Sequence, residues 1–324
     1  MAHPRFAPII PRLQDQIAML FRTTLASLAL ALTLGPLAAP ALAGEAEPQI
    51  ARDDAPAATP PAPFAFAKPV FDRTWATIGI GAAMVPSYAG SDDYIAFPLP
   101  LIVGRVGGVG ISPNGPGFVL DLHSPAPSFA PRKGPRLAFG PAFRFRNDRN
   151  NRIRDEVVAR AGRLDPALEI GANVAVSFSG VFKPFDALSV GVQARRDVLG
   201  AHDGLIVEPQ VGYRALVGKG FTLQAQASAE FVDDNFADYY FSVNPDQALA
   251  TGLPQFRADG GLNRVGTTAI LAYDLDRNPL NGGWSLTGIG GVSRLIGDSA
   301  ATPFTTARGD ATQFILGTGV AYTF

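Results

Sequence analysis

The segment Gln313–Phe324 reads QFILGTGVAYTF, and two kinds of side chain alternate along it. The residues at every second position are Phe314, Leu316, Thr318, Val320, Tyr322 and Phe324. Because successive side chains of a β-strand point to opposite faces, this alternation predicts a strand with one apolar face. A strand of this length crosses a lipid bilayer when it is tilted.

The same period of two recurs through the body of the chain. In RLAFGPAFRFR, residues 136–146, the apolar Leu137, Phe139, Phe143 and Phe145 share one face and the arginines lie on the other. The segments that alternate in this way are 75–85, 95–105, 106–112, 117–123, 136–146, 167–182, 187–196, 204–217, 221–231, 263–274, 284–295 and 312–324. This pattern predicts an all-β fold, an antiparallel transmembrane β-barrel of about twelve strands.

The connections between these segments alternate in length. The short ones are 183–186, 218–220 and 276–283, and the long ones are 86–94, 147–166, 233–262 and 296–311. Short periplasmic turns and long outer loops are typical of outer-membrane barrels, which have an even number of strands in bacteria. Ten strands is the alternative to twelve, because residues 107–117 fit either two short strands or one irregular connection.

The N-terminal part of the chain has the composition of an export signal. Arg22 precedes the apolar run 25–34, and small residues lead to Ala41 and Ala43. This pattern predicts a secretory signal peptide over residues 1–43, with the functional start at Met19 and cleavage after Ala43. Residues 44–71 are rich in Ala and Pro and predict an extended linker, so the barrel is expected over residues 72–324. The predicted location is the bacterial outer membrane.

Charge and composition exclude several classes of protein. The chain has 324 residues, a formal net charge of -1 and no cysteine, so disulfide and cysteine-ligated metal sites are excluded. The absence of a basic surplus argues against a nucleic-acid partner. The expected surroundings are outer-membrane lipid and lipopolysaccharide, and the expected form is a monomer.

Several spaced motifs resemble those of the MipA/OmpV family of outer-membrane proteins. The first is VPSYAGSDDY at residues 85–94, followed by FPLP at residues 97–100. The residues that carry the resemblance are Tyr88, Gly90, Ser91, Asp92, Tyr239, Tyr240, Gly252, Leu253, Arg294, Gly297, Asp298 and Pro303. The chain departs from the family pattern at Thr302, where serine is usual, and in the Gly- and Pro-rich segment 107–136. The resemblance spans residues 72–324.

The resemblance implies a scaffold, because MipA-type proteins are associated with a murein lytic transglycosylase and a bifunctional penicillin-binding protein. Two alternatives stay open, a small-solute channel and an adhesin that uses the long outer loops. The C-terminal aromatic residues Tyr322 and Phe324 look like the signal by which the barrel-assembly machinery recognises its clients.

Candidate catalytic and metal-binding residues are few. His123 and His202 are the histidines beyond the signal segment, and neither has the Ser and orienting acid of a hydrolase in a usable arrangement. Both are expected at the surface. The acidic pairs Asp92–Asp93 and Asp233–Asp234 lack the spacing of a calcium loop. We therefore predict no catalytic, cofactor or metal site.

The polar faces of the strands carry charges of both signs. The residues expected to point into the lumen are Arg136, Arg144, Arg146, Arg195, Arg214, Glu169, Glu208 and Glu230. Paired side chains fill the interior of small barrels, whereas wide barrels stay open. The aromatic residues near strand ends are predicted to form an interfacial girdle. They are Trp75, Tyr88, Tyr94, Tyr239, Tyr240, Trp284 and Tyr322.

Overall fold

The computed structural model describes residues 70–72, 74–123, 134–150 and 152–324. The predicted signal peptide with Ala41 and Ala43, and the linker as far as residue 69, lie outside the described residues. The described chain starts with a short 3-10 turn, Val70–Asp72, whose Val70 N–H donates to the carbonyl of Leu280 at 2.9 Å.

Twelve antiparallel strands close into one barrel, as the alternation predicts. The strands are β1 (Trp75–Pro86), β2 (Tyr94–Val106), β3 (Val109–Pro113), β4 (Gly117–Asp121), β5 (Arg136–Arg146), β6 (Ala167–Ser179), β7 (Ala187–Asp197), β8 (Leu205–Leu216), β9 (Phe221–Val232), β10 (Gly261–Asp274), β11 (Gly283–Leu295) and β12 (Thr312–Thr323). Each strand pairs with its neighbours in the sequence, and β12 closes the barrel against β1, with Ile80 opposite Val320. The alternative of ten strands is wrong, because β3 and β4 are both formed.

Two strand boundaries differ from the prediction for the same physical reason. The segment expected at 106–112 begins instead at Val109, because Gly107 and Gly108 adopt φ values of 59° and 88° and form the turn after β2. The segment expected to reach residue 182 ends at Ser179, because Gly180 has a φ of 68°. Alternation alone does not reveal where a positive φ interrupts a strand.

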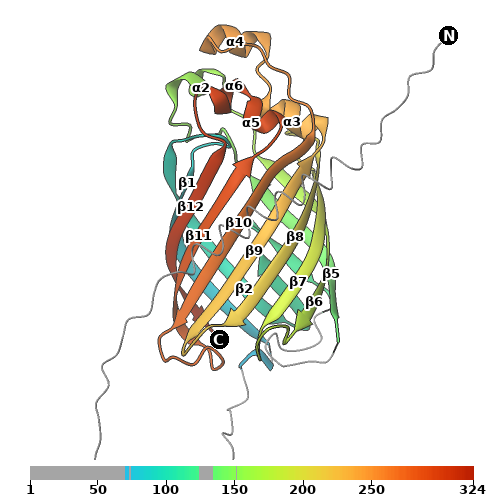
Figure 1. Cartoon of the computed structure of the whole chain (residues 1–324), viewed down its shortest axis with the longest axis vertical. Helices are drawn as coiled ribbons and strands as arrows, with labels where there is room; N and C mark the ends of the chain where they lie inside the picture. Colours follow the sequence, from blue (N-terminus) through green and yellow to red (C-terminus); the bar gives the residue numbers. More distant parts are fainter. Residues whose placement is uncertain (1–69, 73, 124–133, 151) are drawn as a thin grey trace, which may run out of the picture. The chain divides into compact units, whose positions relative to one another are not determined.

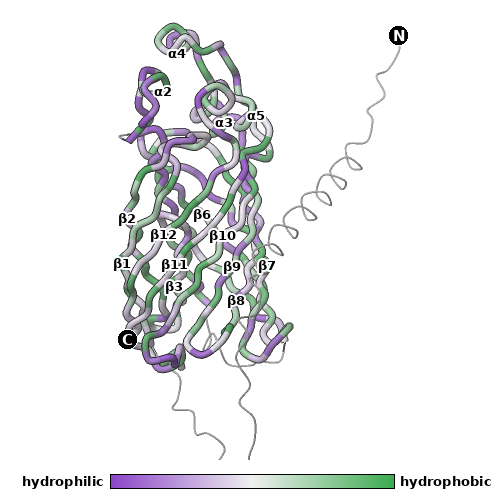
Figure 2. Tube along the Cα trace, turned by 60° about the vertical axis from the view of Figure 1, so that its left-hand side comes forward, coloured by the Kyte–Doolittle hydropathy of each residue, from purple (hydrophilic) through white to green (hydrophobic). Residues whose placement is uncertain are grey.

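Hydrophobic and hydrophilic residues alternate along the strands (Figure 2), and exposed fractions show that the apolar side chains point outward. On β12 the exposed fraction is 56% for Phe314 and 71% for Leu316, whereas the preceding Gln313 is buried. An exposed apolar belt on a barrel is the surface that meets membrane hydrocarbon. Among the described residues, no helix is long and apolar enough to span a bilayer.

Five short helices lie at one end of the barrel (Figure 1), and the C-terminus lies at the other end. They are α2 (Glu156–Arg160), α3 (Asp234–Phe241), α4 (Pro245–Thr251), α5 (Asp298–Ala301) and α6 (Pro303–Thr306). All five fall in the connections that the sequence marks as long outer loops. We call these helices, together with the loop 87–93 between β1 and β2, the cap.

At the opposite end, a small aromatic cluster surrounds the C-terminus. The Trp284 and Tyr322 rings lie 5.1 Å apart, and those of Tyr322 and Phe324 lie 4.7 Å apart. Trp284 is 57% exposed, which fits the predicted girdle. The prediction is wrong for Trp75, Tyr88 and Tyr240, which are buried at 9%, 2% and 3% exposure.

Candidate functional site: a cap over a ring of ion pairs

Three arginines and three glutamates form a closed ring inside the barrel, beneath the cap. In order around the ring they are Arg146, Glu169, Arg195, Glu208, Arg144 and Glu230. Positive and negative side chains alternate around the ring. The N–O distances between neighbours run from 2.6 Å at Arg146–Glu169 to 3.6 Å at Arg144–Glu230. We call this set the ion-pair ring. It confirms that these six predicted lumenal charges point inward.

Strand register explains why the ring forms. Arg144 on β5 lies directly opposite Glu169 on β6, and Arg146 lies one inward-facing position further along β5. Each remaining member occurs on the inward face near the cap end of its own strand, on β7, β8 or β9. Five neighbouring strands thus bring six charges to one level of the barrel, and the net charge of the ring is zero.

The ring is largely buried. Side-chain exposure is 0% for Glu169 and Arg195 and at most 15% for the other four members. Buried charges are stable only when they are paired and their remaining donors and acceptors are satisfied. Neighbouring amides supply such partners: Arg195 donates to Gln193 at 2.6 Å, and Arg144 donates to Asn114 at 2.8 Å.

The ring is coupled to the cap through Glu230. Its carboxylate accepts a 2.6 Å hydrogen bond from the amide of Asn263 at the start of β10, and Asn263 in turn accepts from the hydroxyl of Ser299 in α5. Next to Glu230 in the ring, the guanidinium of Arg146 lies over the Phe236 ring of α3, 4.8 Å from its centroid. Such a cation–aromatic contact is favourable when both groups are shielded from water.

The cap has a small apolar core of its own. Phe236, Tyr240 and Phe241 of α3 are each at most 3% exposed, and they pack with Leu295 at the end of β11. A second cluster joins Tyr88, Val158 of α2 and Phe304 of α6. Burial of this apolar surface holds together segments that are more than 200 residues apart.

Polar contacts fix the geometry of the cap. The Tyr88 hydroxyl donates to the carbonyl of Arg308 at 2.9 Å, and burial together with the charge of Asp155 raises the pKa of Tyr88 above its usual value. Arg149 lies over the Phe304 ring at 4.2 Å and donates to the carbonyl of Tyr240 at 3.2 Å. Thr302, the position where the chain departs from the family pattern, donates to the carbonyl of Phe241 at 2.6 Å.

The family-motif residues converge on the cap. Tyr88 and Tyr240 lie in its core, Pro303 begins α6 in a buried position, and Gly252 ends α4 with a φ of 75°. A Cβ on Gly90 would lie 2.3 Å from the Thr305 hydroxyl oxygen, so this position needs glycine. Three motifs that are remote in the sequence are therefore parts of one structural unit.

The other motif residues lie at the edge of this unit. Ser91 is buried at 1% exposure and its hydroxyl hydrogen-bonds that of Ser87, whereas Asp92 is exposed. Tyr239 and Leu253 are partly buried and pack against the two apolar clusters. Arg294 is exposed and donates to the Thr312 hydroxyl at 2.8 Å.

The comparison with protein families confirms the resemblance seen in the sequence. The model of the family described as "MltA-interacting protein MipA" matches residues 78–324. The chain belongs to the MipA family. As a MipA-family protein with a closed twelve-strand barrel, it is an outer-membrane β-barrel.

Solved structures give more distant similarities to this MipA-family chain. The COG4313 outer membrane channel from Pseudomonas putida F1 is 14% identical, with a TM-score of 0.37, and the match covers 79% of this chain and 98% of the channel. The outer membrane channel DcaP of Acinetobacter baumannii is 11% identical, with a TM-score of 0.29 and coverage of 78% and 96%. No curated protein matched.

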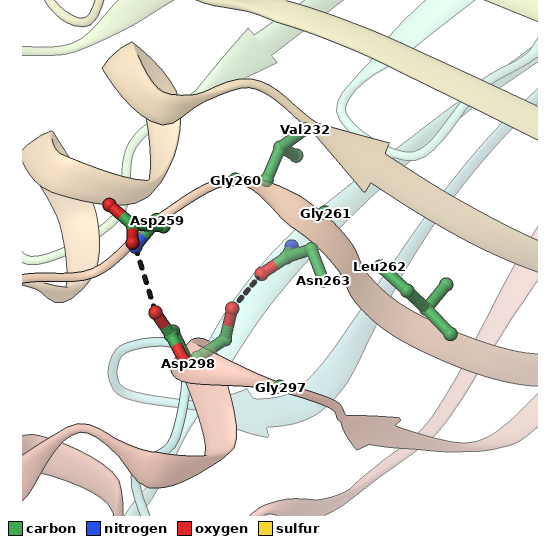
Figure 3. Close-up of a pocket in the computed structure, with 9 residues that line it drawn as sticks. Val232, Asp259, Gly260, Gly261, Leu262, Asn263, Gly297 and Asp298 are labelled. Atoms are coloured by element: carbon green, nitrogen blue, oxygen red, sulfur yellow. Dashed lines mark hydrogen bonds between the residues drawn. The ribbon is translucent and has the colours of Figure 1, made fainter. Parts of the chain in front are cut away.

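Gly297 and Asp298 of the family motif line a pocket of about 300 Å³ at the start of β10. Figure 3 shows Asn263, Asp259 and Asp298 around it. The Asp298 carboxylate already accepts the backbone N–H of Asp259 at 2.8 Å. This carboxylate oxygen thus joins α5 to the segment that precedes β10, which is a structural role.

The structure corrects the expectation for His202. This histidine is 3% exposed, not at the surface, and packs 5.0 Å from the Phe236 ring under the cap. Its Nδ1 accepts the N–H of Gly204 at 3.0 Å, and its Nε2 lies 3.8 Å from Glu169 of the ion-pair ring. Its ring also lies 5.5 Å from that of Tyr240, so His202 forms part of the packing under the cap.

The acidic pair Asp233–Asp234, weighed above as cation ligands, caps backbone instead. Asp233 accepts the N–H groups of Phe236 and Leu205 at 3.1 Å and 2.9 Å, and Asp234 accepts that of Gly260 at 2.8 Å. The first of these bonds begins helix α3. Within the described residues, no group of three or more acidic or histidine side chains is arranged to hold a metal ion.

Proposed function

We propose that this MipA-family barrel is a non-enzymatic, monomeric scaffold of the outer membrane, which binds a murein lytic transglycosylase at its periplasmic end. The family name states an interaction with MltA, a lytic transglycosylase. A penicillin-binding protein is the second proposed partner, so that the barrel joins the membrane to enzymes that remodel peptidoglycan. Residues 1–43 are proposed to be removed during export.

The ion-pair ring is the observation that favours a scaffold over a channel. A conducting lumen needs a continuous column of water, and charges that line such a column are solvated. The ring members are instead at most 15% exposed. On the opposite wall, Gln313 at the cap end of β12 is 4% exposed and donates to the carbonyl of Ser91.

The turns at the end of the barrel opposite the cap are the proposed partner surface. They present apolar side chains to solvent: Phe182 is 70% exposed and Leu275 is 53% exposed. Asp186 of the same turn as Phe182 is buried, because it accepts the N–H groups of Val181, Phe182 and Lys183. This carboxylate makes the turn rigid, so that Phe182 is held in an exposed position.

Photo-crosslinking in intact cells tests the scaffold. A photoreactive residue replaces Phe182 in one variant and Lys219, in the neighbouring turn, in another. Capture of a lytic transglycosylase or a penicillin-binding protein supports the proposal. A matched control places the same residue at Leu249, which is 86% exposed on the cap helix α4.

Two results would contradict the proposal. One is capture of assembly chaperones alone at normal barrel abundance. The other is steady conductance of the purified barrel in planar bilayers that changes with Arg144→Ala, which would favour a channel. For the signal segment, the N-terminal sequence of the purified protein is expected to begin at Gly44.

A further inference from the structure

Two arginines lie on the outward faces of the strands. Arg196 on β7 has the same parity as Val192, which is 43% exposed, whereas its neighbour Arg195 points into the ion-pair ring. Arg294 on β11 has the same parity as Leu286, which is 48% exposed. In the described strands, every other Asp, Glu and Arg side chain has the parity that points inward.

Both outward arginines lie at the cap end of the barrel. Arg196 is the penultimate residue of β7 and Arg294 is the penultimate residue of β11, and both strands run toward the cap. At the opposite end, the outward positions carry the aromatic side chains of Tyr213, Tyr273 and Trp284 instead. An arginine costs little at either edge of a bilayer, so chance would place such residues at both ends. The restriction to one end therefore indicates a property of the membrane surface on that side.

Apolar side chains surround Arg196 on the outer surface of the barrel. Across the neighbouring strands it lies opposite Ile170 of β6 and Leu205 of β8, which are 36% and 46% exposed. Beyond it in the chain, Val198 and Leu199 are 54% and 60% exposed. A guanidinium in such surroundings at a membrane is stabilised when an anion neutralises it.

The acid next to Arg196 in the sequence is already used. Asp197 has the opposite parity and is 4% exposed. Its carboxylate accepts the N–H groups of Leu199, His202 and Asp203 at 3.0 Å, 2.9 Å and 3.3 Å. Asp197 therefore fixes the loop that follows β7 and does not neutralise Arg196.

The rest of the described chain supplies no counter-anion either. Among the described residues, neither Arg196 nor Arg294 forms an ion pair with a carboxylate. Arg294 donates to the hydroxyl of Thr312 at 2.8 Å, and this hydroxyl is neutral. Asp310 accepts the backbone N–H of Thr312 at 2.6 Å. The structure thus leaves neutralisation to a molecule outside the barrel.

The position of the two arginines selects the kind of anion. Guanidinium groups bind phosphates in a two-pronged geometry. The long connections mark the cap end as the outer side of the membrane. The outer leaflet there is made of lipopolysaccharide, whose lipid A carries phosphates on its sugars directly above the acyl chains. Such a phosphate lies at the level where the apolar belt ends and the arginines begin.

We propose that Arg196 and Arg294 bind phosphates of lipopolysaccharide in the outer leaflet. Around Arg196, the acyl chains lie against Ile170 and Leu205 while the guanidinium binds the phosphate above them. This assignment rests on the same outward orientation of the cap as the proposed scaffold.

Native mass spectrometry of the delipidated full barrel in detergent tests the site, with diphosphoryl lipid A as the probe. Arg196→Gln is expected to weaken binding about fivefold, the usual contribution of one basic residue at an anionic membrane surface, and Arg294→Gln is expected to do the same. Arg196→Lys keeps the charge and should bind nearly as the parent does. Arg257→Gln is the matched control, because Arg257 is 86% exposed in the cap and lies outside the strands.

Unchanged binding of lipid A to Arg196→Gln would overturn the proposal. A second measurement needs no variant: removal of both phosphates from lipid A should weaken its binding to the parent barrel, and equal binding of the two lipids would also overturn the proposal. This arm decides the matter if Arg196→Gln does not give the heat-modifiable band of a folded barrel.

Phosphatidylglycerol separates the two sources of lipid phosphate. The parent barrel is expected to bind it more weakly than lipid A, and Arg196→Gln should change its binding less. An equal loss for both lipids would overturn the assignment to lipopolysaccharide. Failure here together with capture of a transglycosylase at Phe182 would overturn the lipid site alone and leave the scaffold supported.

Discussion

The guanidinium of Arg308, in the last loop, lies 2.6 Å from the carboxylate of Asp155, which is 153 positions earlier in the chain. The same carboxylate accepts the N–H of Val158 at 2.8 Å and begins helix α2. One side chain therefore both starts a helix and joins two loops of the cap. Its removal should loosen the cap without opening the barrel.

Asp155→Ala is expected to increase hydrogen exchange across α2 and α6 while the strands stay protected. The lost helix cap alone costs about 1 kcal/mol. Hydrogen exchange measured by mass spectrometry checks the effect. Asp259→Ala is the control, because its pair with Arg257 is 3.9 Å apart and exposed. Equal exchange in both variants would show that the Asp155 contacts do not stabilise the cap.

The cap should also loosen in acid. Burial tends to raise the pKa of Asp155, but hydrogen bonds from Arg308 and from the N–H of Val158 outweigh it and lower the pKa. Because the folded pKa is below the unfolded one, the stabilisation is complete above pH of about 4 and is lost as the pH falls through the folded value. Protease nicking between pH 7 and pH 3 should locate cleavage first in the cap. Asp155→Asn should be nicked at both pH values, and resistance of Asp155→Asn at pH 7 would contradict this account.

The ion-pair ring predicts a large and specific stability effect. Glu169→Ala leaves Arg146 and Arg195 without their shared carboxylate, and breaking a buried pair costs about 3–5 kcal/mol. The urea midpoint of unfolding should fall accordingly. At the end opposite the cap, Asp121→Ala removes a partly exposed pair with Arg136, for which about 0–1 kcal/mol is expected. Similar urea midpoints for the two variants would show that the ion-pair ring does not stabilise the barrel.

Gly90 provides a matched test of cap docking. Gly90→Ala places a Cβ 2.3 Å from the Thr305 hydroxyl oxygen at a residue whose φ is 98°. Gly107 also has a positive φ, but a Cβ there meets nothing within 4 Å. Gly90→Ala should therefore raise hydrogen exchange in α6, whereas Gly107→Ala should cost only the strain of its backbone, about 1 kcal/mol. Protection of α6 that is unchanged in Gly90→Ala would contradict the tight packing.

Phe324 is predicted to act during assembly more than in the finished barrel. Its backbone N–H donates to the carbonyl of Ala76 at 2.9 Å, and this bond survives the side-chain change in Phe324→Ala. Outer-membrane levels of Phe324→Ala should fall, while the unfolding midpoint of the assembled fraction stays near that of the parent. Leu316→Ala, on the same exposed face of β12, is the control. Normal amounts of the Phe324→Ala protein in the outer membrane would contradict a role of Phe324 in assembly.

Period-two alternation predicted the barrel because every strand has lipid on one side and lumen on the other. The convergence of the motifs could not be read in the same way, because contacts such as Tyr88 with Arg308 join residues that only the closed barrel brings together. The same holds for His202, whose burial depends on α3 lying over it.

The helices of the cap left a partial signal in the sequence. Asn244, Pro245 and Gln247 form a capping box with proline in the first turn, and the structure shows both hydrogen bonds of that box. This pattern is readable as the start of a helix. By contrast, α5 and α6 have 4 residues each and no side-chain cap bond, so local sequence gives little indication of them.

The contact between Tyr88 and the loop of Arg308 has a consequence for the order of events during biogenesis. Tyr88 follows the first strand and Arg308 precedes the last, so this contact lies beside the seam where β12 pairs with β1 to close the barrel. The cap is therefore a late-forming element. In a pulse-chase experiment, the time at which the cap becomes resistant to protease would report when the barrel closes.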